Sequence, residues 1–303
     1  MAIIVKILGS NSASFAHNRH HTCQILQVKD KYLMIDCGEG TQLQCKRYNV
    51  KLSKIDHILI SHLHGDHYYG LIGLLSTMHL YGRQKELTLA GPPGLKEIIS
   101  LQLRYSETRL NFSVAFTEWV PENIQTVLET ERFTVDTIPL DHRVPCSGYL
   151  IKEKPNRRRI NRELLKETLP PSHLHALKSS EDVYDEDGKL LYRWEDVTKP
   201  PLKNVSYAYC SDTRFKPDII EQIKDSDLVY HEATFADDMK KRAYDTYHTT
   251  AKQAASIARD AEVSQLLIGH FSTRYKDLDV VLEEARAVFP HTSLAIEGNT
   301  FNA

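Results

Sequence analysis

The sequence predicts an α/β protein in which two β-sheets pack face to face and helices cover their outer sides. Apolar stretches typical of strands alternate with helical stretches in both halves of the chain. A segment rich in prolines and charges, residues 154–203, separates these halves and predicts a protruding insertion. With 41% hydrophobic and 26% charged residues, the chain has the composition of a soluble globular protein with one large domain or two small ones.

The first half is predicted to open with strands and then to alternate. Strands are expected at AIIVKIL (2–8), CQILQVK (23–29), KYLMIDC (31–37), IDHILIS (55–61), LTLAGP (87–92), FSVAFTEWV (112–120), RFTVDTIPL (132–140) and CSGYLIK (146–152). Helices are expected at GTQLQCKRYN (40–49), from the histidine-rich segment to about Tyr81, and at GLKEIISLQLRYS (94–106). Asp30 marks a tight turn between two of the strands.

The α/β alternation resumes after the insertion. Strands are expected at SYAYCSD (206–212), DLVYHEA (227–233), QLLIGHF (265–271) and SLAIEG (293–298). Helices are expected at AKQAASIARDA (251–261) and LDVVLEEARAVF (278–289). Each half therefore alternates strands and helices, which suggests two packed sheets with helices outside.

Composition narrows the class of protein. The formal net charge of −2 excludes a strongly basic nucleic-acid binder, although a local basic patch remains compatible with one. No apolar run approaches the roughly 18 to 20 residues of a membrane helix, and the N-terminus lacks the features of a secretory signal. The 5 cysteines are scattered and never spaced as CxxC, so we expect reduced thiols and a cytoplasmic location.

The segment SHLHGDH (61–67) holds the strongest chemical signal in the chain. It follows a predicted buried strand and contains His62, His64, Asp66 and His67. The ordinary alternative is a solvated polar loop, which suits a lone histidine better than such a cluster. Four ligands are more than one tetrahedral zinc can readily take from a single loop, so they favour two metal ions that share a site. Imidazole and carboxylate ligands favour zinc over magnesium or calcium.

Further ligands are expected at the ends of other strands. His142 lies just past a predicted strand, and Asp212 and His270 lie at the ends of two others. Taken alone, each could be a capped or solvated loop residue. Together with the histidine cluster, they complete a plausible ligand set for two metals.

These motifs resemble those of the metallo-β-lactamase superfamily and, within it, the ribonuclease Z family. The resemblance covers nearly the whole chain, through DCGEGTQLQ (36–44), SHLHGDH (61–67), HRVPCSGYLI (142–151), SDTR (211–214), HEATF (231–235), AYDTYHTTAKQAA (243–255) and GHFSTRY (269–275). The histidine cluster alone is common to the superfamily, whereas HEAT with YHTT is specific to the ribonuclease branch. The implied fold is an αββα sandwich of the metallo-β-lactamase type, a single domain over residues 1–303 with an arm inserted at residues 154–203.

The resemblance implies two Zn²⁺ ions per chain. One would be held by His62, His64 and His142, the other by Asp66, His67 and His270, with Asp212 bridging them. Asp66 would also accept the proton of the attacking water. His248 would protonate the departing oxygen, and Glu232 would orient it. Asp36 is expected behind the metal site, and the alternative is a carboxylate in a turn at the end of a strand. His231 is open to two interpretations, a role beside Glu232 or a place in the core.

The implied activity is cleavage of the 3′ trailer from tRNA precursors after the discriminator nucleotide, which leaves a 3′-hydroxyl on the tRNA. The stretch KEKPNRRRINRELLK (152–166) carries a local net charge of +5 and resembles the arm with which the family grips precursor tRNA. Arg157, Arg158 and Arg159 are the expected phosphate contacts, although a basic solvated surface is the common alternative. The resemblance also implies a homodimer.

The chain departs from the family pattern in two places. At the arm tip, Ser172 and His173 stand where the family has Gly-Pro. In the N-terminal loop, Phe15 and His20 stand where it has Pro and Asn. The histidines of this loop more reasonably line the substrate approach or face solvent than hold a third metal. The alternative function is a metallo-hydrolase of a small thioester, lactone, sulfate ester or phosphodiester, and HEAT, YHTT and the basic arm argue against it.

Overall fold

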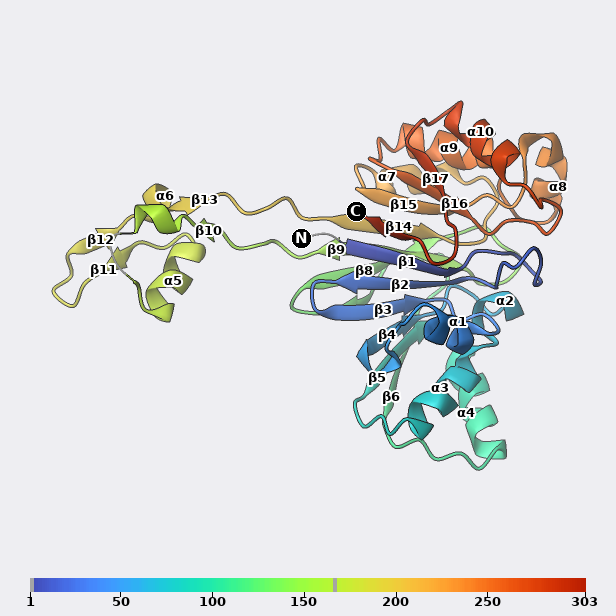
Figure 1. Cartoon of the computed structure of the whole chain (residues 1–303), viewed down its shortest axis with the longest axis horizontal. Coiled ribbons are helices and arrows are strands. Elements are labelled where there is room, and N and C mark those ends of the chain that lie inside the picture. Colours follow the sequence, from blue (N-terminus) through green and yellow to red (C-terminus); the bar gives the residue numbers. More distant parts are fainter. Residues whose placement is uncertain (1–2, 166–167) are drawn as a thin grey trace. The chain divides into compact units, whose positions relative to one another are not determined.

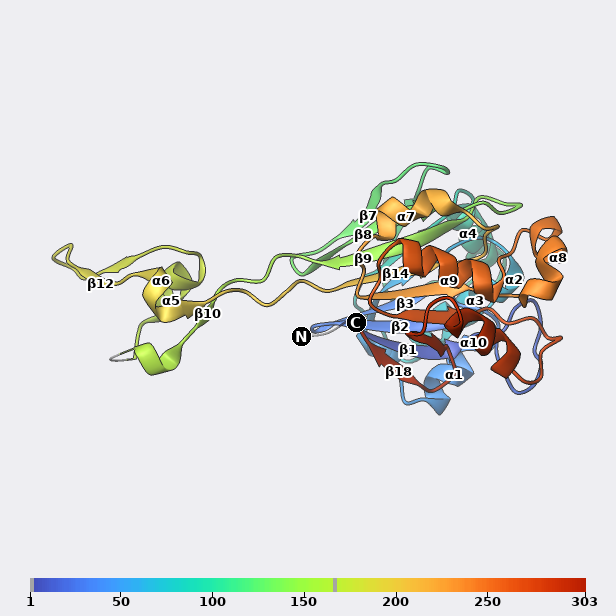
Figure 2. The same ribbon diagram turned by 90° about the horizontal axis from the view of Figure 1, so that it is seen from above.

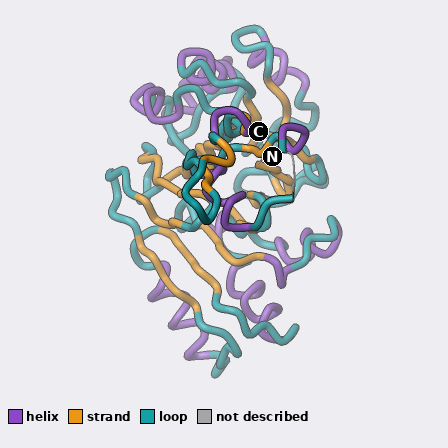
Figure 3. Tube along the Cα trace, turned by 90° about the vertical axis from the view of Figure 1, so that its left-hand side faces the viewer, coloured by secondary structure: helices purple, strands orange, loops and turns teal. Residues whose placement is uncertain are grey.

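Two sheets lie face to face in the computed structural model, which describes residues 3–165 and 168–303. Each sheet has seven strands within the described residues. Helices cover the outer side of each sheet, so the layers run helix, sheet, sheet, helix (Figures 1 and 3). The predicted αββα sandwich is therefore confirmed.

The first sheet is built from the N-terminal half, and the C-terminal strand lies at one of its edges. Its order is β18 (Thr300–Asn302), β1 (Ile3–Gly9), β2 (Cys23–Val28), β3 (Lys31–Ile35), β4 (Ile55–Leu59), β5 (Leu87–Gly91) and β6 (Val114–Glu118). The pairs from β3 to β6 are parallel, and those from β18 to β3 are antiparallel. Its helices are α1 (Thr41–Arg47), α2 (Gly65–Tyr68), α3 (Leu71–Leu80) and α4 (Leu95–Tyr105), with a 3₁₀ turn at Leu52–Lys54.

The second sheet has the order β17 (Thr292–Leu294), β16 (Leu266–Gly269), β15 (Leu228–Glu232), β14 (Ser206–Cys210), β9 (Ser147–Glu153), β8 (Phe133–Pro139) and β7 (Thr126–Glu129). Strands β14 to β17 are parallel. Its helices are α7 (Ile220–Ile223), α8 (Lys240–Asp245), α9 (Ala251–Asp260) and α10 (Asp279–Arg286), with 3₁₀ turns at Pro217–Ile219 and Asp237–Met239. Figure 2, seen from above, shows α9 and α10 lying over the strands.

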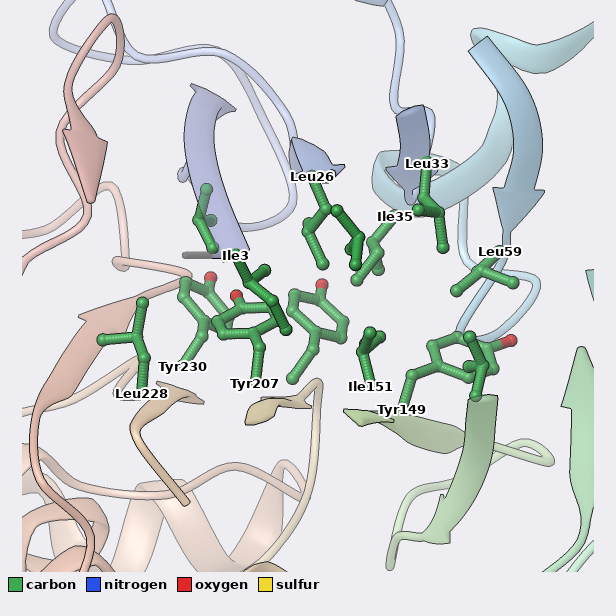
Figure 4. Close-up of a cluster of buried hydrophobic side chains, with 14 of the residues drawn as sticks. Ile3, Leu26, Leu33, Ile35, Leu59, Tyr149, Ile151, Tyr207, Leu228 and Tyr230 are labelled. Atoms are coloured by element: carbon green, nitrogen blue, oxygen red, sulfur yellow. The ribbon is translucent and has the colours of Figure 1, made fainter. Parts of the chain in front are cut away.

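The inner faces of both sheets form one apolar core (Figure 4). Alternation along each strand decides which residues enter it, because successive side chains point to opposite faces. On β14, Tyr207 and Tyr209 enter this core, whereas Ala208 and Cys210 pack under the helices. Several buried tyrosines of the second sheet reach across to the first, since a buried hydroxyl needs a partner. Tyr149, for example, donates to the Ile60 carbonyl at 2.6 Å.

The inserted arm is a compact unit of its own, Glu153–Asn204. It contains β10 (Arg159–Ile160), a 3₁₀ turn at Arg162–Leu164, α5 (Pro171–Lys178), β11 (Val183–Tyr184), β12 (Leu190–Tyr192), α6 (Trp194–Val197) and β13 (Thr198–Lys199). Strand β10 pairs with β13, and β11 pairs with β12. A small core holds these elements together, formed by Leu169, Leu177, Val183, Tyr192 and Val197. The sequence shows no sustained period here because each element is very short.

Two short edge strands were not anticipated from the sequence. Strands β7 and β18 both lie outside every predicted stretch. The predicted last strand at 293–298 corresponds to β17 and is shorter than expected. It ends at Leu294, and the chain then crosses to the other sheet as β18. Short strands at sheet edges carry too few alternating positions for a pattern to reveal them. None of the helices within the described residues has the length and apolar character needed to cross a bilayer.

Candidate metal centre

The predicted ligands converge because the strands that precede them are parallel. Strands β14, β15 and β16 run in register side by side, so their carboxyl ends meet at one edge of the second sheet. Asp212, Glu232 and His270 lie at these ends. The segment after β4 brings His62 to His67 to the same place from the first sheet. The site therefore forms where the ends of both sheets meet.

A first group joins His62, His64 and His142. The Nε2 of His62 and the Nε2 of His142 each lie 3.1 Å from the Nδ1 of His64. The Oδ2 of Asp212 lies 3.8 Å from His62 Nε2 and 3.9 Å from His142 Nε2. The four ligand atoms fall within 4.8 Å of one another, which is compatible with a single ion among them.

A second group joins Asp66, His67 and His270. The Nε2 atoms of His67 and His270 are 3.3 Å apart, and the Oδ2 of Asp66 lies 3.6 Å and 3.4 Å from them. The other carboxylate oxygen of Asp212, Oδ1, lies 3.4 Å from His67 Nε2 and 3.2 Å from His270 Nε2. Asp212 thus turns one oxygen toward each group.

The chemistry of this cluster fits bound cations. The Oδ1 of Asp212 is buried and has no hydrogen-bond partner among the described residues. Ring nitrogens of neighbouring histidines face each other with lone pairs or protons that cannot all be satisfied. Asp36, Asp66, Asp212 and Glu232 also concentrate negative charge in one largely buried place, which is costly without compensation. Metal ions would relieve all three conditions, and we conclude that the cluster is a metal-binding site.

Asp36 lies directly behind the second group and is fully buried. One carboxylate oxygen accepts from the Ser61 amide at 2.8 Å. The other lies 2.7 Å from His67 Nδ1 and accepts from Ser61 Oγ at 2.9 Å and from Tyr209 at 2.6 Å. This contact fixes the His67 ring so that Nε2 points into the cluster. Asp36 therefore lies where the sequence placed it, behind the ligands.

One threonine and one serine support the site, and neither was predicted from the sequence. Thr234 Oγ1 donates to Glu232 Oε2 at 2.8 Å and lies 2.9 Å from His270 Nδ1. Ser61 Oγ lies 3.0 Å from His62 Nδ1. Both residues fall inside stretches that the sequence had singled out, HEATF and SHLHGDH. Their hydroxyls could have been anticipated from the need of each ligating imidazole for a partner on its other nitrogen.

His248 and Glu232 form a hydrogen-bonded pair beside the cluster. The Nδ1 of His248 lies 3.0 Å from Glu232 Oε1, and Asp212 Oδ2 is 4.0 Å from the same nitrogen. Burial by itself would lower the pKa of His248. The charge and hydrogen bond of Glu232, and then the charge of Asp212, have the larger effect and raise this pKa to about 9. Bound cations would oppose this rise. With Nδ1 engaged, Nε2 is the atom that can act on a bound molecule.

Glu232 is fixed by its backbone surroundings. Oε1 also accepts from the amides of Thr213 and Thr249, at 3.2 and 3.0 Å. Burial raises the pKa of Glu232, and His248 lowers it by more. His231, next in the strand, is fully buried and has its Nδ1 2.7 Å from the Glu232 carbonyl oxygen. Alternation along β15 turns it away from the inner face on which Glu232 lies.

The N-terminal loop forms a wall of the site. The amide of Ala13 donates to Asp66 Oδ2 at 2.8 Å. The His20 ring pairs with Glu297, and His17 Nε2 lies 2.9 Å from the Thr273 carbonyl oxygen. His21 is buried at the cleft wall. Within residues 3–165 and 168–303, none of these histidines belongs to a group that could hold a metal.

The cluster opens into a cleft of about 660 Å³. His64, Asp66, His142, His248 and His270 all line it. Three exposed arginines, Arg143, Arg242 and Arg274, surround it. A cleft that combines a metal site with arginines suits an anionic substrate, and above all a phosphate ester.

The predicted phosphate contacts of the arm differ from one another in the structure. Arg158 is partly buried, with its guanidinium 4.3 Å from the centre of the Trp194 ring and its Nε donating to Thr198 Oγ1 at 2.7 Å. Arg157 and Arg159 are exposed. Charge is also separated along the arm, since EDVYDED (181–187), around β11, contains five carboxylates, Glu181, Asp182, Asp185, Glu186 and Asp187.

Comparison with known proteins agrees with this geometry. Residues 3–156 match the family model described as anti-Pycsar protein Apyc1. The ribonuclease Z of Cytophaga hutchinsonii is 49% identical over 97% of this chain and 94% of its own length. The crystal structure of human tRNase Z, short form, aligns with a TM-score of 0.71 at 25% identity, covering 98% of both chains. The metallo-β-lactamase fold protein YhfI of Bacillus subtilis aligns with a TM-score of 0.70 at 19% identity over the full length of both.

Replacement of Asp36 tests how far the site depends on the residue behind it. Asp36 has φ 56°, a left-handed conformation that Asn tolerates better than Ala. Asp36→Ala also leaves several buried donors unsatisfied, so we expect a loss of about 3–5 kcal/mol in the free energy of unfolding. Asp36→Asn should lose less, about 1–3 kcal/mol. Urea unfolding in the presence of chelator measures this without any contribution from metal.

The matched control is Asp30→Ala, which removes a carboxylate that is 66% exposed in a surface turn. We expect that variant to change the unfolding free energy by less than about 0.5 kcal/mol. Equal midpoints for Asp36→Ala and Asp30→Ala would contradict the role given to Asp36.

Proposed function

Since the chain belongs to the ribonuclease Z family, and its residues 3–156 also to the family described as anti-Pycsar protein Apyc1, we propose that it removes the 3′ trailer from tRNA precursors. It is an endoribonuclease that cuts after the discriminator nucleotide and leaves a 3′-hydroxyl on the tRNA. The observation that carries the proposal is the Glu232–His248 pair beside the metal cluster. A small-ester hydrolase of the same fold needs the metal cluster but has no evident use for this pair.

We propose that the cluster holds two zinc ions. His62, His64 and His142 would hold one, Asp66, His67 and His270 the other, and Asp212 would contact both. Two of the three groups of ligand atoms found in the cluster support this assignment, and the third joins Asp212 and His270 to His248. Zinc fits because the donors are imidazole nitrogens and carboxylate oxygens. When bound, the ions lower the pKa of water and offset charge on the phosphate.

The protein's own side chains supply proton transfer and orientation. Asp66, which lines the cleft, would accept the proton of the attacking water. His248 donates a proton from Nε2 to the departing 3′-oxygen of the tRNA, which a poor leaving group requires. Glu232 holds the His248 ring by Nδ1 and favours its protonated form. The three arginines of the cleft bind the flanking phosphates.

We propose that the arm binds precursor tRNA through phosphates. Arg157, Arg159 and Lys178 are suited to this role, because the first two are exposed and the Lys178 carbonyl accepts from the Arg158 amide beside them. Arg158 instead supports the arm through Trp194. The acidic hairpin at 181–187 would repel RNA. The basic residues around β10 and α5 therefore form the RNA-binding side of the arm.

We further propose a homodimer in the cytoplasm. The family resemblance supports a dimer in which the arm of one subunit presents tRNA to the site of the other. All five cysteines are free and buried, which suits a reducing compartment. Sedimentation of the purified protein measures the oligomeric state directly.

The function is tested by incubation of the protein with a precursor tRNA that carries a 3′ extension. The expected product is a tRNA that ends at the discriminator nucleotide with a 3′-hydroxyl. The product end is mapped by sequencing and by ligation that requires a 3′-hydroxyl. An intact precursor, or cuts scattered along the trailer, would contradict the proposal.

The metal content tests the two-zinc site. We expect about two zinc-class ions per chain in elemental analysis of pure protein. Asp212→Ala should lose bound metal from both groups and abolish cleavage, because it removes the ligand they share. Asp218→Ala, which removes an exposed carboxylate nearby in the chain, should retain both ions. Fully active protein with one ion or none would refute the two-metal assignment.

Replacement of His248 tests the proton donor. His248→Ala should keep the metals and tRNA binding but slow cleavage by roughly 10² to 10⁴-fold, the usual contribution of a general acid. Glu232→Ala should slow it less. A nitrophenyl phosphodiester, whose leaving group needs little protonation, should be affected far less by either change. The control is His291→Ala, which replaces an exposed histidine. Equal losses on both substrates would mean that His248 is not the acid.

Deletion of the arm tests its role in RNA binding. Lys152 of β9 pairs directly with Ser206 of β14, so a short Gly/Ser linker can replace residues 155–200. We expect the deleted protein to retain its metals and its activity on a small phosphodiester. Binding of precursor tRNA should weaken, with a shallower dependence on salt, because phosphate contacts are lost.

A milder test is the double variant Arg157→Ala, Arg159→Ala. The salt slope should decrease by about 2, roughly one for each phosphate contact, and affinity should fall similarly for different tRNAs. The double variant Arg104→Ala, Arg132→Ala, which removes two exposed arginines outside the arm, is the control. An arm-deleted protein with unchanged cleavage rate and salt slope would exclude the arm as the tRNA contact.

A further inference from the structure

A second pocket of about 400 Å³ adjoins the metal cleft at His248. Its other lining residues are Phe215, Lys240, Lys241, Tyr244 and Gln253. His248 lines both this pocket and the cleft that contains the metal ligands. The pocket therefore lies beside the proton donor, and the other residues that line it are not among the predicted metal ligands.

Two aromatic rings at this pocket are accessible to a ligand. Phe215 is 41% exposed and Tyr244 is 62% exposed. Exposed aromatic rings offer flat surfaces on which a base can stack. Lys240 and Lys241 are also exposed and add positive charge beside the rings. Aromatic rings interleaved with lysines form a surface suited to an unpaired nucleotide.

Tyr244 is held in place by Arg214. The guanidinium of Arg214 lies 4.2 Å from the centre of the Tyr244 ring and 3.4 Å from that of Tyr247. Its Nε donates to the Tyr244 carbonyl at 2.8 Å. At the pocket wall, Gln253 uses Oε1 to accept from the Thr250 amide in the cap of α9, which leaves its Nε2 group as a donor. The pocket therefore has a fixed aromatic surface and a hydrogen-bond donor.

The position of the acid decides which nucleotide reaches this pocket. On the proposed function, His248 donates to the 3′-oxygen of the discriminator nucleotide, so the ribose that carries this oxygen lies within hydrogen-bond reach of Nε2. The base of that nucleotide is joined to the same ribose and enters one of the two cavities that His248 lines. On the proposed function the metal cleft takes the scissile phosphate, which leaves this pocket for the base. The first trailer nucleotide is joined through the other side of the phosphate.

We propose that Phe215, Tyr244 and the lysines beside them bind the discriminator nucleotide, with its unpaired base stacked on the aromatic rings. This inference rests on the proposed function and adds a base-binding subsite to it. Stacking accepts any base, as an enzyme that acts on many tRNAs requires. The lysines would contact the phosphate that precedes the discriminator nucleotide.

A double-mutant cycle between protein and RNA tests the subsite. Phe215→Ala and Tyr244→Ala are each assayed on a normal precursor tRNA and on one with an abasic discriminator nucleotide. On the normal precursor we expect kcat/KM to fall by roughly 5- to 150-fold, the equivalent of about 1–3 kcal/mol of base stacking. On the abasic precursor, the variants and the unchanged protein should cleave at nearly equal rates.

Conservative variants and a remote aromatic residue provide the controls. Phe215→Tyr and Tyr244→Phe keep a ring and should retain most activity, whereas Phe215→Leu and Tyr244→Leu fill space without a ring and should behave as the alanine variants do. Tyr105→Ala replaces a tyrosine that is 75% exposed at the end of α4 and should have no effect. Metal content should remain unchanged in all of them.

Each other outcome has a defined meaning. If the variants impair the normal and the abasic discriminator substrates equally, the pocket does not bind that base. If their effect disappears only when the first trailer nucleotide is abasic, the pocket binds the trailer, and the inference is wrong. If the unchanged protein does not cut precursor tRNA at all, the proposed function fails first, and that result is visible before any variant is made.

Discussion

The hydrogen bonds of the Asp36 carboxylate are the interaction on which the site depends. Asp36 comes at the end of β3, in the first sheet, and accepts from Tyr209 of the second. It also accepts a hydrogen bond from the Ser61 amide and contacts the His67 ring. One buried carboxylate therefore links both sheets and the histidine loop. Its left-handed backbone is the local strain that this placement requires.

The metal ligands and the Glu232–His248 pair come together at that junction. The histidine loop comes from the first sheet, whereas Asp212, Glu232 and His270 come from parallel strands of the second. Neither sheet alone contains a complete ligand set. The inner tyrosines that bridge the sheets therefore fix the spacing of the ligand groups as well as the core. A shift of one sheet over the other would separate the ligands before it exposed much apolar surface.

The sequence predicted the centre of the protein better than its edges. The long alternating stretches and the histidine cluster were sufficient for the sandwich and for the convergence of the ligands. Strands β7 and β18 were missed because a few edge residues carry little pattern. The arm core was missed because its elements are two to eight residues long and pack on one another only in three dimensions. The use of Arg158 inside the arm, against Trp194, depends on a contact that charge counting cannot reveal.

The arm also bears on how the chain folds. Strands β9 and β14 must pair, although the whole arm separates them in sequence. Closing a long loop costs entropy that grows with its length. Pairing of β10 with β13 holds the middle of the arm in a separate unit and leaves a much shorter effective loop between the two core strands. If the effective loop is shortened by half and then by half again, the entropic cost of closing it falls by about 1 kcal/mol. An arm that folds early therefore hastens completion of the second sheet, and a destabilised arm would delay assembly of a site to which it contributes no ligand.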